Sequence, residues 1–251
     1  MLMLDHAHEV RRDALAAIPT PVGTRSWRPV PHHQVVDALI DRAQARGLRI
    51  VSERYAVTDG AIYPERGHSI PIPGARLYGS LDFEPIDGIP FPDGCRPSAG
   101  LRNSHDKSFA LSILAGSRVI VCANGLLLAE HVVSRKHTSR LSLSDEIDRA
   151  LDAFLEAMVD FRQVHDRLHN QRLSRMRGHH AIIELARAGA FASSDILRVA
   201  NEWAEPRHRA FRERTAWTLY QAASEVMKAQ SPGRQVDGFK ALSETMLALT
   251  N

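Results

Sequence analysis

The stretch SAGLRNSHDKSFALSILAGSRVIVCANGLLLAEHVV, residues 98–133, decides the fold. Over residues 109–113, large apolar residues alternate with small or polar ones, which is typical of a strand with one buried face. Residues 118–124 form a continuous apolar run rich in β-branched residues, so we expect a central buried strand there. The stretch therefore predicts a β-sheet rather than a helical domain.

Two dipeptides in the same stretch indicate where the chain turns. Gly116-Ser117 favours a turn, and Asn124-Gly125 is a strong hairpin signal. We expect a return strand over residues 126–133, although a short helix is an alternative. Strands joined by such short turns predict an antiparallel meander rather than a doubly wound parallel sheet.

Upstream of this stretch, the pattern predicts one helix and two further strands. Residues 32–46 place five apolar side chains on one helical face, and Gly47 is a natural helix stop. The helical face consists of Val35, Val36, Leu39, Ile40 and Ala43. Strands are expected over 48–57 and 75–86, with a turn and an irregular loop between them.

Downstream of residue 140, proline is almost absent and helical periodicity begins. Apolar residues then recur at steps of three and four, which predicts a long amphipathic helix from Ser142 to about Met176, before Gly178. The stripe consists of Ile147, Leu151, Phe154, Met158, Phe161, His165 and Leu168. Shorter helices are expected at 179–188, 193–203, 206–229 and 235–249.

These elements predict an α+β fold: an antiparallel β-meander preceded by a helix and followed by a long helix and a helical C-terminal half. We expect an α/β sheet region with Pro- and Gly-rich loops over residues 1–140. A helical region over 141–251 would pack on it. One continuous domain is the alternative to two separate regions.

Composition excludes several classes of protein. The chain has 251 residues, 44% of them hydrophobic, with 32 Lys and Arg against 29 Asp and Glu and a net charge of +3. Disorder is excluded by the high apolar content and low charge. A disulfide scaffold is excluded because there are only two cysteines, Cys95 and Cys122. No apolar run is long enough for a membrane span, so no membrane association is expected.

The same features give an expected setting. We interpret residues 1–13 as lacking a secretory leader, which together with two cysteines predicts a reducing, cytoplasmic location. The sequence pI near 9.1 suits an anionic partner but does not require one. The excess of arginine over lysine equally suits an arginine-rich genome.

Four residues are weak candidates for catalysis: His105, Asp106, Cys122 and His137. An adjacent carboxylate can orient an imidazole, and a nucleophilic cysteine needs a nearby base. The alternative is a polar turn at residues 103–108 and an inert buried thiol, and we favour it. We therefore favour a protein that is not an enzyme and expect no cofactor.

Basic residues form two candidate nucleic-acid surfaces. The segment SRKHTSR, residues 134–140, is the densest basic and hydroxyl cluster, and residues 206–217 set arginines beside aromatic rings. Solvated faces are the alternative for both. The candidate nucleic-acid-binding residues are Arg102, Lys107, Arg135, Lys136, His137, Arg140, Arg207, Arg209 and Arg212.

A metal site and the common nucleotide motifs find little support. His165 and His169 are four residues apart on the predicted long helix, but Asp166 stands where a zinc-protease motif has Glu, so no metal is expected. The sequence contains no Walker phosphate loop, no GxGxxG after a strand and no GxSxG elbow.

The ordered set NSHDKS, RVIVCANGL and RKHTS, followed by a long helix, resembles the uncharacterised phage/plasmid-like protein family. That family is a domain of unknown function carried by phages, plasmids and integrated elements. The resemblance spans roughly residues 25–170 and departs at Lys107, where the family usually has Gly. The resemblance implies mobile-element biology in the cytoplasm of a bacterial host cell, but it assigns no reaction to any residue.

Three hypotheses for the function follow. The first, which we favour, is a mobile-element accessory protein that binds nucleic acid, such as a protein that binds or anneals single-stranded DNA in recombination or replication. The second is an anti-defence protein that binds and inhibits a host component, with the long helix as a docking or homo-oligomer element. The third is an enzyme that uses the His/Asp/Cys residues.

Overall fold

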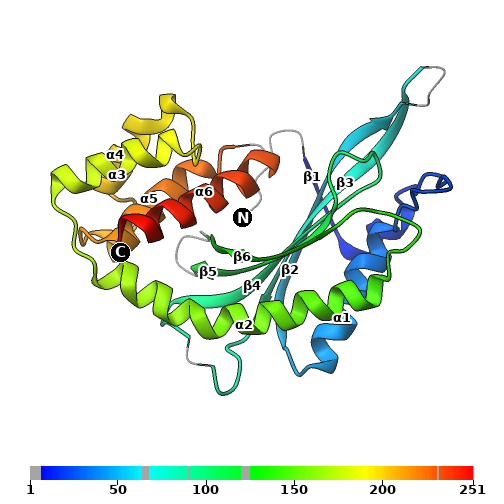
Figure 1. Ribbon diagram of the computed structural model, residues 1–251, viewed down its shortest axis with the longest axis horizontal. Helices are drawn as coiled ribbons and strands as arrows, with labels where there is room; N and C mark the ends of the chain where they lie inside the picture. The colour runs from blue at the N-terminus through cyan, green and yellow to red at the C-terminus, as the bar shows by residue number, and fades with distance from the viewer. Residues whose placement is uncertain (1–6, 64–67, 90, 120–124, 231, 251) are drawn as a thin grey trace.

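The computed structural model describes residues 7–63, 68–89, 91–119, 125–230 and 232–250, and side chains outside 118–133, 232, 233 and 236. It consists of a twisted β-sheet with one long helix crossing a face and a group of helices at one end (Figure 1). Sheet first and helices second is the predicted α+β architecture, which is therefore confirmed.

The sheet has six strands in sequence order, and each strand is antiparallel to its neighbour. The antiparallel meander is thus confirmed. Its strands are β1 (His8–Val10), β2 (Ile50–Ile62), β3 (Ile70–Phe83), β4 (Cys95–Ser104), β5 (Leu111–Val119) and β6 (Gly125–Arg135).

Three details of the predicted sheet were wrong. An irregular loop does not follow residue 57, because β2 and β3 continue as a two-stranded arm that projects from the body (Figure 1). β4 was not predicted. Gly116 and Ser117 lie inside β5 instead of forming a turn. The pairing of β5 with β6 shifts register between Leu114 and Gly116. Of the central strand expected over 118–124, the first two residues end β5, and residues 120–124 lie outside the described part.

Prolines explain why the arm was missed. Pro71 and Pro73 lie in the half of β3 beyond the end of β4, which pairs with β3 only as far as Arg76. There the backbone has a free edge, where a missing N–H costs no ladder bond. A rule that reads proline as a strand breaker therefore fails at such a position.

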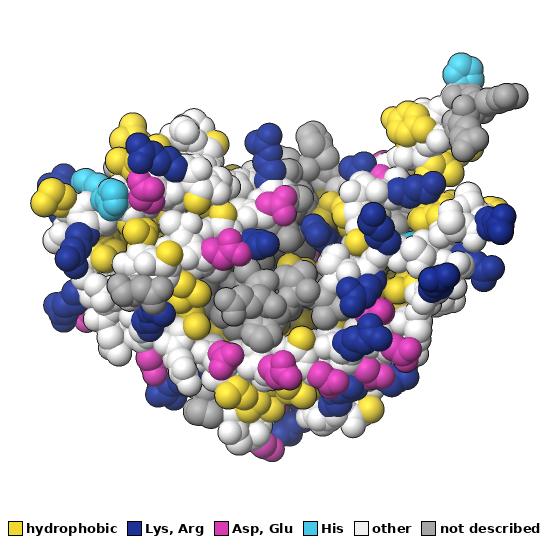
Figure 2. All heavy atoms as spheres, in the orientation of Figure 1, with side chains coloured by type: hydrophobic (Ala, Val, Ile, Leu, Met, Phe, Trp, Pro, Cys, Tyr) yellow, Lys and Arg dark blue, Asp and Glu magenta, His cyan; other side chains and the backbone are white. Residues whose placement is uncertain are grey.

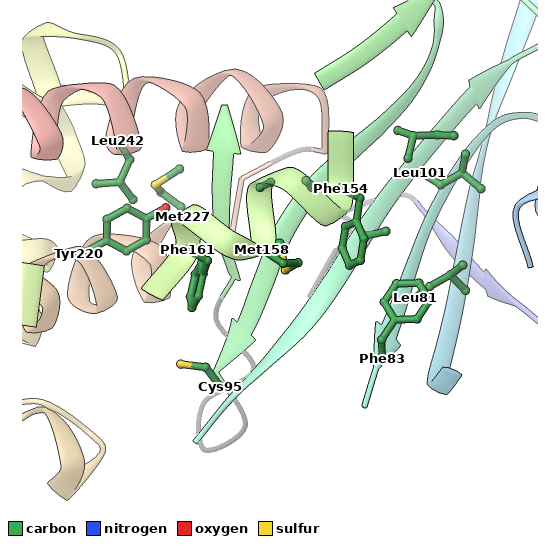
Figure 3. Close-up of a cluster of buried hydrophobic side chains, with 14 of the residues drawn as sticks. Leu81, Phe83, Cys95, Leu101, Phe154, Met158, Phe161, Tyr220, Met227 and Leu242 are labelled. Atoms are coloured by element: carbon green, nitrogen blue, oxygen red, sulfur yellow. The ribbon is translucent and has the colours of Figure 1, made fainter. Parts of the chain in front are cut away.

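One face of the sheet carries the apolar core. The helix α1 (His32–Ala45) buries its predicted stripe, and α2 (Leu143–Asn170) buries its own across the sheet. Phe154 of α2 packs on Phe83 of β3, with ring centroids 5.2 Å apart. Figure 3 shows this cluster continuing from the sheet through α2 to side chains of the C-terminal helices.

The long helix ends earlier than predicted. After Asn170 the backbone pairs with a distant segment: Leu173 donates its N–H to the carbonyl of Arg214, and Ala216 donates to Gln171. A new helix, α3 (Arg175–Arg187), then begins with Ser174 as its cap. Gly178, expected to stop the long helix, lies inside α3.

Only glycine fits at position 178, because the ring of Trp203 packs directly against its backbone. A β-carbon at this position would lie 2.0 Å from the indole ring. Trp203 belongs to α4 (Ile196–Ala204), so the glycine sets how closely α3 and α4 approach each other.

The last helices are α5 (Ala216–Met227) and α6 (Pro232–Leu249). The helix predicted to open at Pro206 begins ten residues later, because Thr215 and Thr218 form a reciprocal cap there. Short 3-10 turns complete the chain: η1 (Arg12–Ala17), η2 (Ser193–Asp195) and η3 (Arg209–Phe211).

Within the described residues, no helix has both the length and the apolar character needed to cross a bilayer. The apolar stripe of α2 is occupied inside the chain itself. Pairing of two copies through α2 stays a prediction, and it would use the outer face of the helix, where Val159 is 57% exposed.

Candidate nucleic-acid interface

Two of the predicted motifs bind the backbone of one residue, Val30. The Nε2 of His105 donates to the carbonyl of Val30 at 2.9 Å, and the side-chain amide of Asn103 donates to the same oxygen. The backbone N–H of Val30 in turn donates to Nδ1 of His137 at 3.2 Å. The segment before α1 therefore ties the turn after β4 to the segment after β6.

The same amide of Asn103 reaches a third histidine. It donates to Nδ1 of His32, whose Nε2 donates to the carbonyl of Gly74. The ring of His32 stacks on that of His105, with centroids 3.8 Å apart. His32 accepts at Nδ1 and donates from Nε2, His105 donates from Nε2, and His137 accepts at Nδ1. These roles assign one neutral tautomer to each ring.

Burial keeps these histidines neutral. Burial, with a smaller contribution from the charge of His105, lowers the pKa of His32 to about 3. Burial likewise lowers the pKa of His137 to about 4. Burial also lowers the pKa of His105, against a smaller upward effect of the carbonyl of Val30.

The histidine cluster is enclosed, and this bears on the catalytic hypothesis. His105 and His137 converge, as a shared site requires, but they are only 0% and 4% exposed. Both hold backbone rather than facing a cleft. Cys122 lies outside the described residues. In the described structure, His105 and His137 fix the backbone of Val30. The assignment of these residues to catalysis stays an untested prediction.

The turn after β4 contains a strained lysine. Lys107 has a φ of 65°, the one positive value among the described residues that are not glycine. This left-handed conformation suits glycine better than lysine. Here the ammonium of Lys107 lies 4.7 Å from the ring centre of Trp27, and this cation–π contact offsets part of the strain.

A second cation lies on an aromatic ring nearby. The guanidinium of Arg102 lies 5.3 Å from the ring centre of Phe109, and its Nε donates to the hydroxyl of Ser112. Phe109 also contacts Tyr78, with centroids 5.5 Å apart. These side chains lie on the sheet face opposite α1 and α2, because they alternate with the core residues of β3 and β4.

Sequence reasoning missed one arginine on this face. Arg76 of β3 donates its Nε to Asp106 at 2.7 Å, and the carboxylate is only 2% exposed. A β-carbon on Gly60 would lie 2.3 Å from that carboxylate, so the glycine makes room for it. The available signal was the alternation of Arg76 and Tyr78 with the core leucines of the same strand.

The segment after β6 adds two more exposed cations. Lys136 and Arg140 are exposed, whereas Arg135 pairs with Glu146 of α2 at 3.0 Å and His137 is buried. Backbone pairing of Trp27 with Thr138 places this segment beside the Lys107 turn.

We call Arg76, Arg102, Lys107, Lys136 and Arg140 the basic end of the sheet. Figure 2 shows several Lys and Arg side chains on the right of the molecule, where Figure 1 places the loops after β4 and β6, and others spread over the left. Among the described residues, Asp106 is the one carboxylate that forms an ion pair with any of these five.

The predicted helical arginines are placed differently. Arg207 is paired with Glu202 of α4 at 3.1 Å and with Glu225 of α5 at 3.3 Å, so it links two helices. Arg209 and Arg212 are exposed on and beside η3. Arg207 borders a cleft of about 960 Å³ between β1–β3 and the helices α4 and α5.

That cleft is electrically balanced. Four basic side chains and four glutamates line it, namely Arg54, Arg198, Arg207, Lys228, Glu9, Glu202, Glu205 and Glu225. A polyanion therefore finds less attraction there than at the basic end.

The two histidines of α2 do not form a metal centre in the described structure. His165 and His169 stack with centroids 5.6 Å apart, and Nδ1 of His165 lies 3.1 Å from Asp166. Trp217 packs edge-on against His165. Within the described part of the chain, no three His, Cys, Asp or Glu side chains gather as metal ligands.

Comparison with known proteins places the chain in a family without naming a function. No curated protein and no solved structure matches it. A family model matches residues 88–246, more than half of the chain. The match includes β4, the Lys107 turn and the helical half, and so extends beyond residue 170, where the resemblance noted from the sequence ended. The chain therefore belongs to the family described as Domain of unknown function (DUF932).

Proposed function

We propose that this protein binds single-stranded nucleic acid, DNA in the first instance, at the basic end of the sheet. The observation that carries the proposal is a pair of cation–π contacts at the turn after β4. Arg102 lies on Phe109 and Lys107 lies on Trp27.

Such pairs suit a single strand for a physical reason. Bases stack on aromatic rings and on guanidinium planes, and this requires bases that are not enclosed in a duplex. Arg102 is already held by Phe109 and by the hydroxyl of Ser112, so less entropy is lost when a base stacks on its guanidinium.

Charge supports the same surface. Lys107, Lys136 and Arg140 are exposed and have no acidic partner among the described residues. Cations that are not neutralised by neighbours attract phosphates and release counterions on binding. Arg135 and Arg207, which are paired with glutamates, contribute less than the sequence alone predicted.

The biological setting is part of the proposal. The resemblance of residues 103–108, 118–126 and 135–139 to a phage/plasmid-like family supports a role in mobile-element recombination or replication. A single-strand binder is a common requirement of both processes.

The experiment is fluorescence anisotropy of a labelled DNA of about 30 nucleotides, single- or double-stranded, across a salt series from about 50 to about 300 mM. The test variant is Arg102→Gln/Lys107→Gln. The matched control is Arg209→Gln/Arg212→Gln, which removes the same charge from the helical half.

We expect the single strand to bind more tightly than the duplex. The test variant should reduce both affinity and the salt slope, by about one unit of slope for each phosphate that is no longer neutralised. The control should bind like the wild type. Absence of binding at the lowest salt concentration, or equal losses of affinity in both variants, would overturn the proposal.

A further inference from the structure

Two arginines on the open sheet face are held in the same way. Arg76 is fixed through its Nε by Asp106, and Arg102 is fixed through its Nε by Ser112. In neither case do the terminal Nη groups have a hydrogen-bond partner among the described residues. Each side chain is therefore held through its Nε, while its terminal Nη donors make no hydrogen bond to the described residues.

The sheet register brings the two arginines together. Tyr78 of β3 lies opposite Arg102 of β4, and Arg76 lies two residues along β3 on the same face. Diagonal neighbours of this kind have β-carbons about 7 Å apart, within reach of two long side chains. The charges of both arginines act on the hydroxyl of Tyr78 and oppose the rise in its pKa that burial causes.

We propose that Arg76 and Arg102 together hold one phosphodiester of the bound strand, and that Asp106 is the residue that positions Arg76 for it. This deepens the proposed function and rests on it. Two guanidinium forks around one phosphate give charge-assisted, geometrically specific hydrogen bonds.

Asp106 is built to orient rather than to neutralise. Its second oxygen accepts from the backbone N–H of Ser108, so the carboxylate is fixed by the turn itself. Gly60 leaves it no spare room. A buried carboxylate beside a proposed phosphate site weakens anion binding by its charge, so it must act through the geometry that it imposes on Arg76.

This opposition of charge and geometry gives a sharp test. Asp106→Asn makes the site more positive, so a purely electrostatic surface would bind DNA more tightly. If Asp106 positions Arg76, the same change weakens binding. The matched control is Asp145→Asn, which removes a charge from an exposed carboxylate in the first turn of α2, five residues after Arg140 in the chain.

The experiment measures anisotropy of the labelled single strand with full-length protein. We expect Arg76→Gln to weaken binding about tenfold, in line with loss of a charged hydrogen bond, and to lower the salt slope by about one. Asp106→Asn should weaken binding at least about threefold, while Asp145→Asn leaves it unchanged or tightens it. In the double variant Arg76→Gln/Asp106→Asn, affinity should equal that of Arg76→Gln alone.

The outcomes separate the two proposals. If Arg76→Gln leaves DNA binding unchanged, or if Asp106→Asn tightens it, the proposed phosphodiester site at Arg76 and Arg102 is overturned. The proposed function is then left standing. No binding by the wild type overturns both. Should thermal melting show that Asp106→Asn is unfolded, Arg76→Lys decides the matter. This variant keeps the positive charge but lacks the guanidinium group with its paired donors. Weakened binding therefore supports the proposed phosphodiester site, and binding equal to that of the wild type overturns it.

Discussion

Acid should unfold this protein at a higher pH than titration of its carboxylates alone would require, because His32, His105 and His137 are buried close to the backbone of Val30. In the folded state the pKa values of His32 and His137 are about 3 and about 4. In the unfolded chain both return to about 6.5. Between these values the unfolded state binds more protons, so stability is complete above about pH 6.5 and falls as the pH is lowered.

The magnitude follows from the size of the shifts. At pH 5, each of these two histidines costs the folded state about 2 kcal/mol, from about 1.5 pH units at about 1.4 kcal/mol each. The sum of about 4 kcal/mol is a large share of the roughly 5–15 kcal/mol that typically stabilises a domain. His105 adds a loss of the same sign, because burial lowers its pKa too.

The assay is urea unfolding at about pH 8 and about pH 5, followed by tryptophan fluorescence. His137→Gln should shrink the pH-dependent loss by about 2 kcal/mol, because glutamine can still accept from the N–H of Val30 but does not titrate. His180→Gln, at an exposed position of α3, is the matched control and should not alter the loss. Equal stability of the wild type at both pH values, or an unchanged loss in His137→Gln, would refute the reasoning.

Three further predictions concern packing and backbone. Gly178→Ala should lower the free energy of unfolding by more than about 2 kcal/mol, since its methyl group would overlap the ring of Trp203; urea titration measures this, and a neutral effect would contradict the packing. Lys107→Gly should be more stable than Lys107→Ala by about 1 kcal/mol, because only glycine relieves the positive φ; equal melting of the two would refute the strain. Asn103→Ala should cost about 1–3 kcal/mol, because it leaves the buried Nδ1 of His32 unpaired and removes one of the two hydrogen bonds to the carbonyl of Val30, and hydrogen exchange at Val30 should speed up; an unchanged exchange rate would contradict this role of Asn103.

The parts of the fold that the sequence predicted are those with strong periodicity. The stripes of α1 and α2 repeat over several turns, so one face is unambiguous. The end of α2 depends instead on pairing between residues 171–173 and 214–216, which no local pattern reveals. The arm of β2 and β3 was hidden because Pro71 and Gly60 occupy strand positions that depend on their neighbours.

The candidate site shows the same division. Local composition pointed to the motifs at residues 103–108 and 134–140, and the structure ties both to Val30. Composition could not reveal that His137 is buried and Lys136 exposed, because the two are adjacent in a segment without periodicity. Arg76 stood alone in the sequence, and its importance appears only through a carboxylate 30 residues away.

The hold of Val30 on both motifs bears on how the family should be cut for experiments. The region matched by the family model begins at residue 88, after β3. Yet β4 pairs with β3, and Asn103 and His105 donate to the carbonyl of Val30, so their partners lie outside the matched region. A fragment starting at residue 88 would open with an unprotected strand edge and buried donors without acceptors. In this chain the region matched by the family model is thus smaller than the unit that folds, and a fragment for expression should start upstream of Trp27.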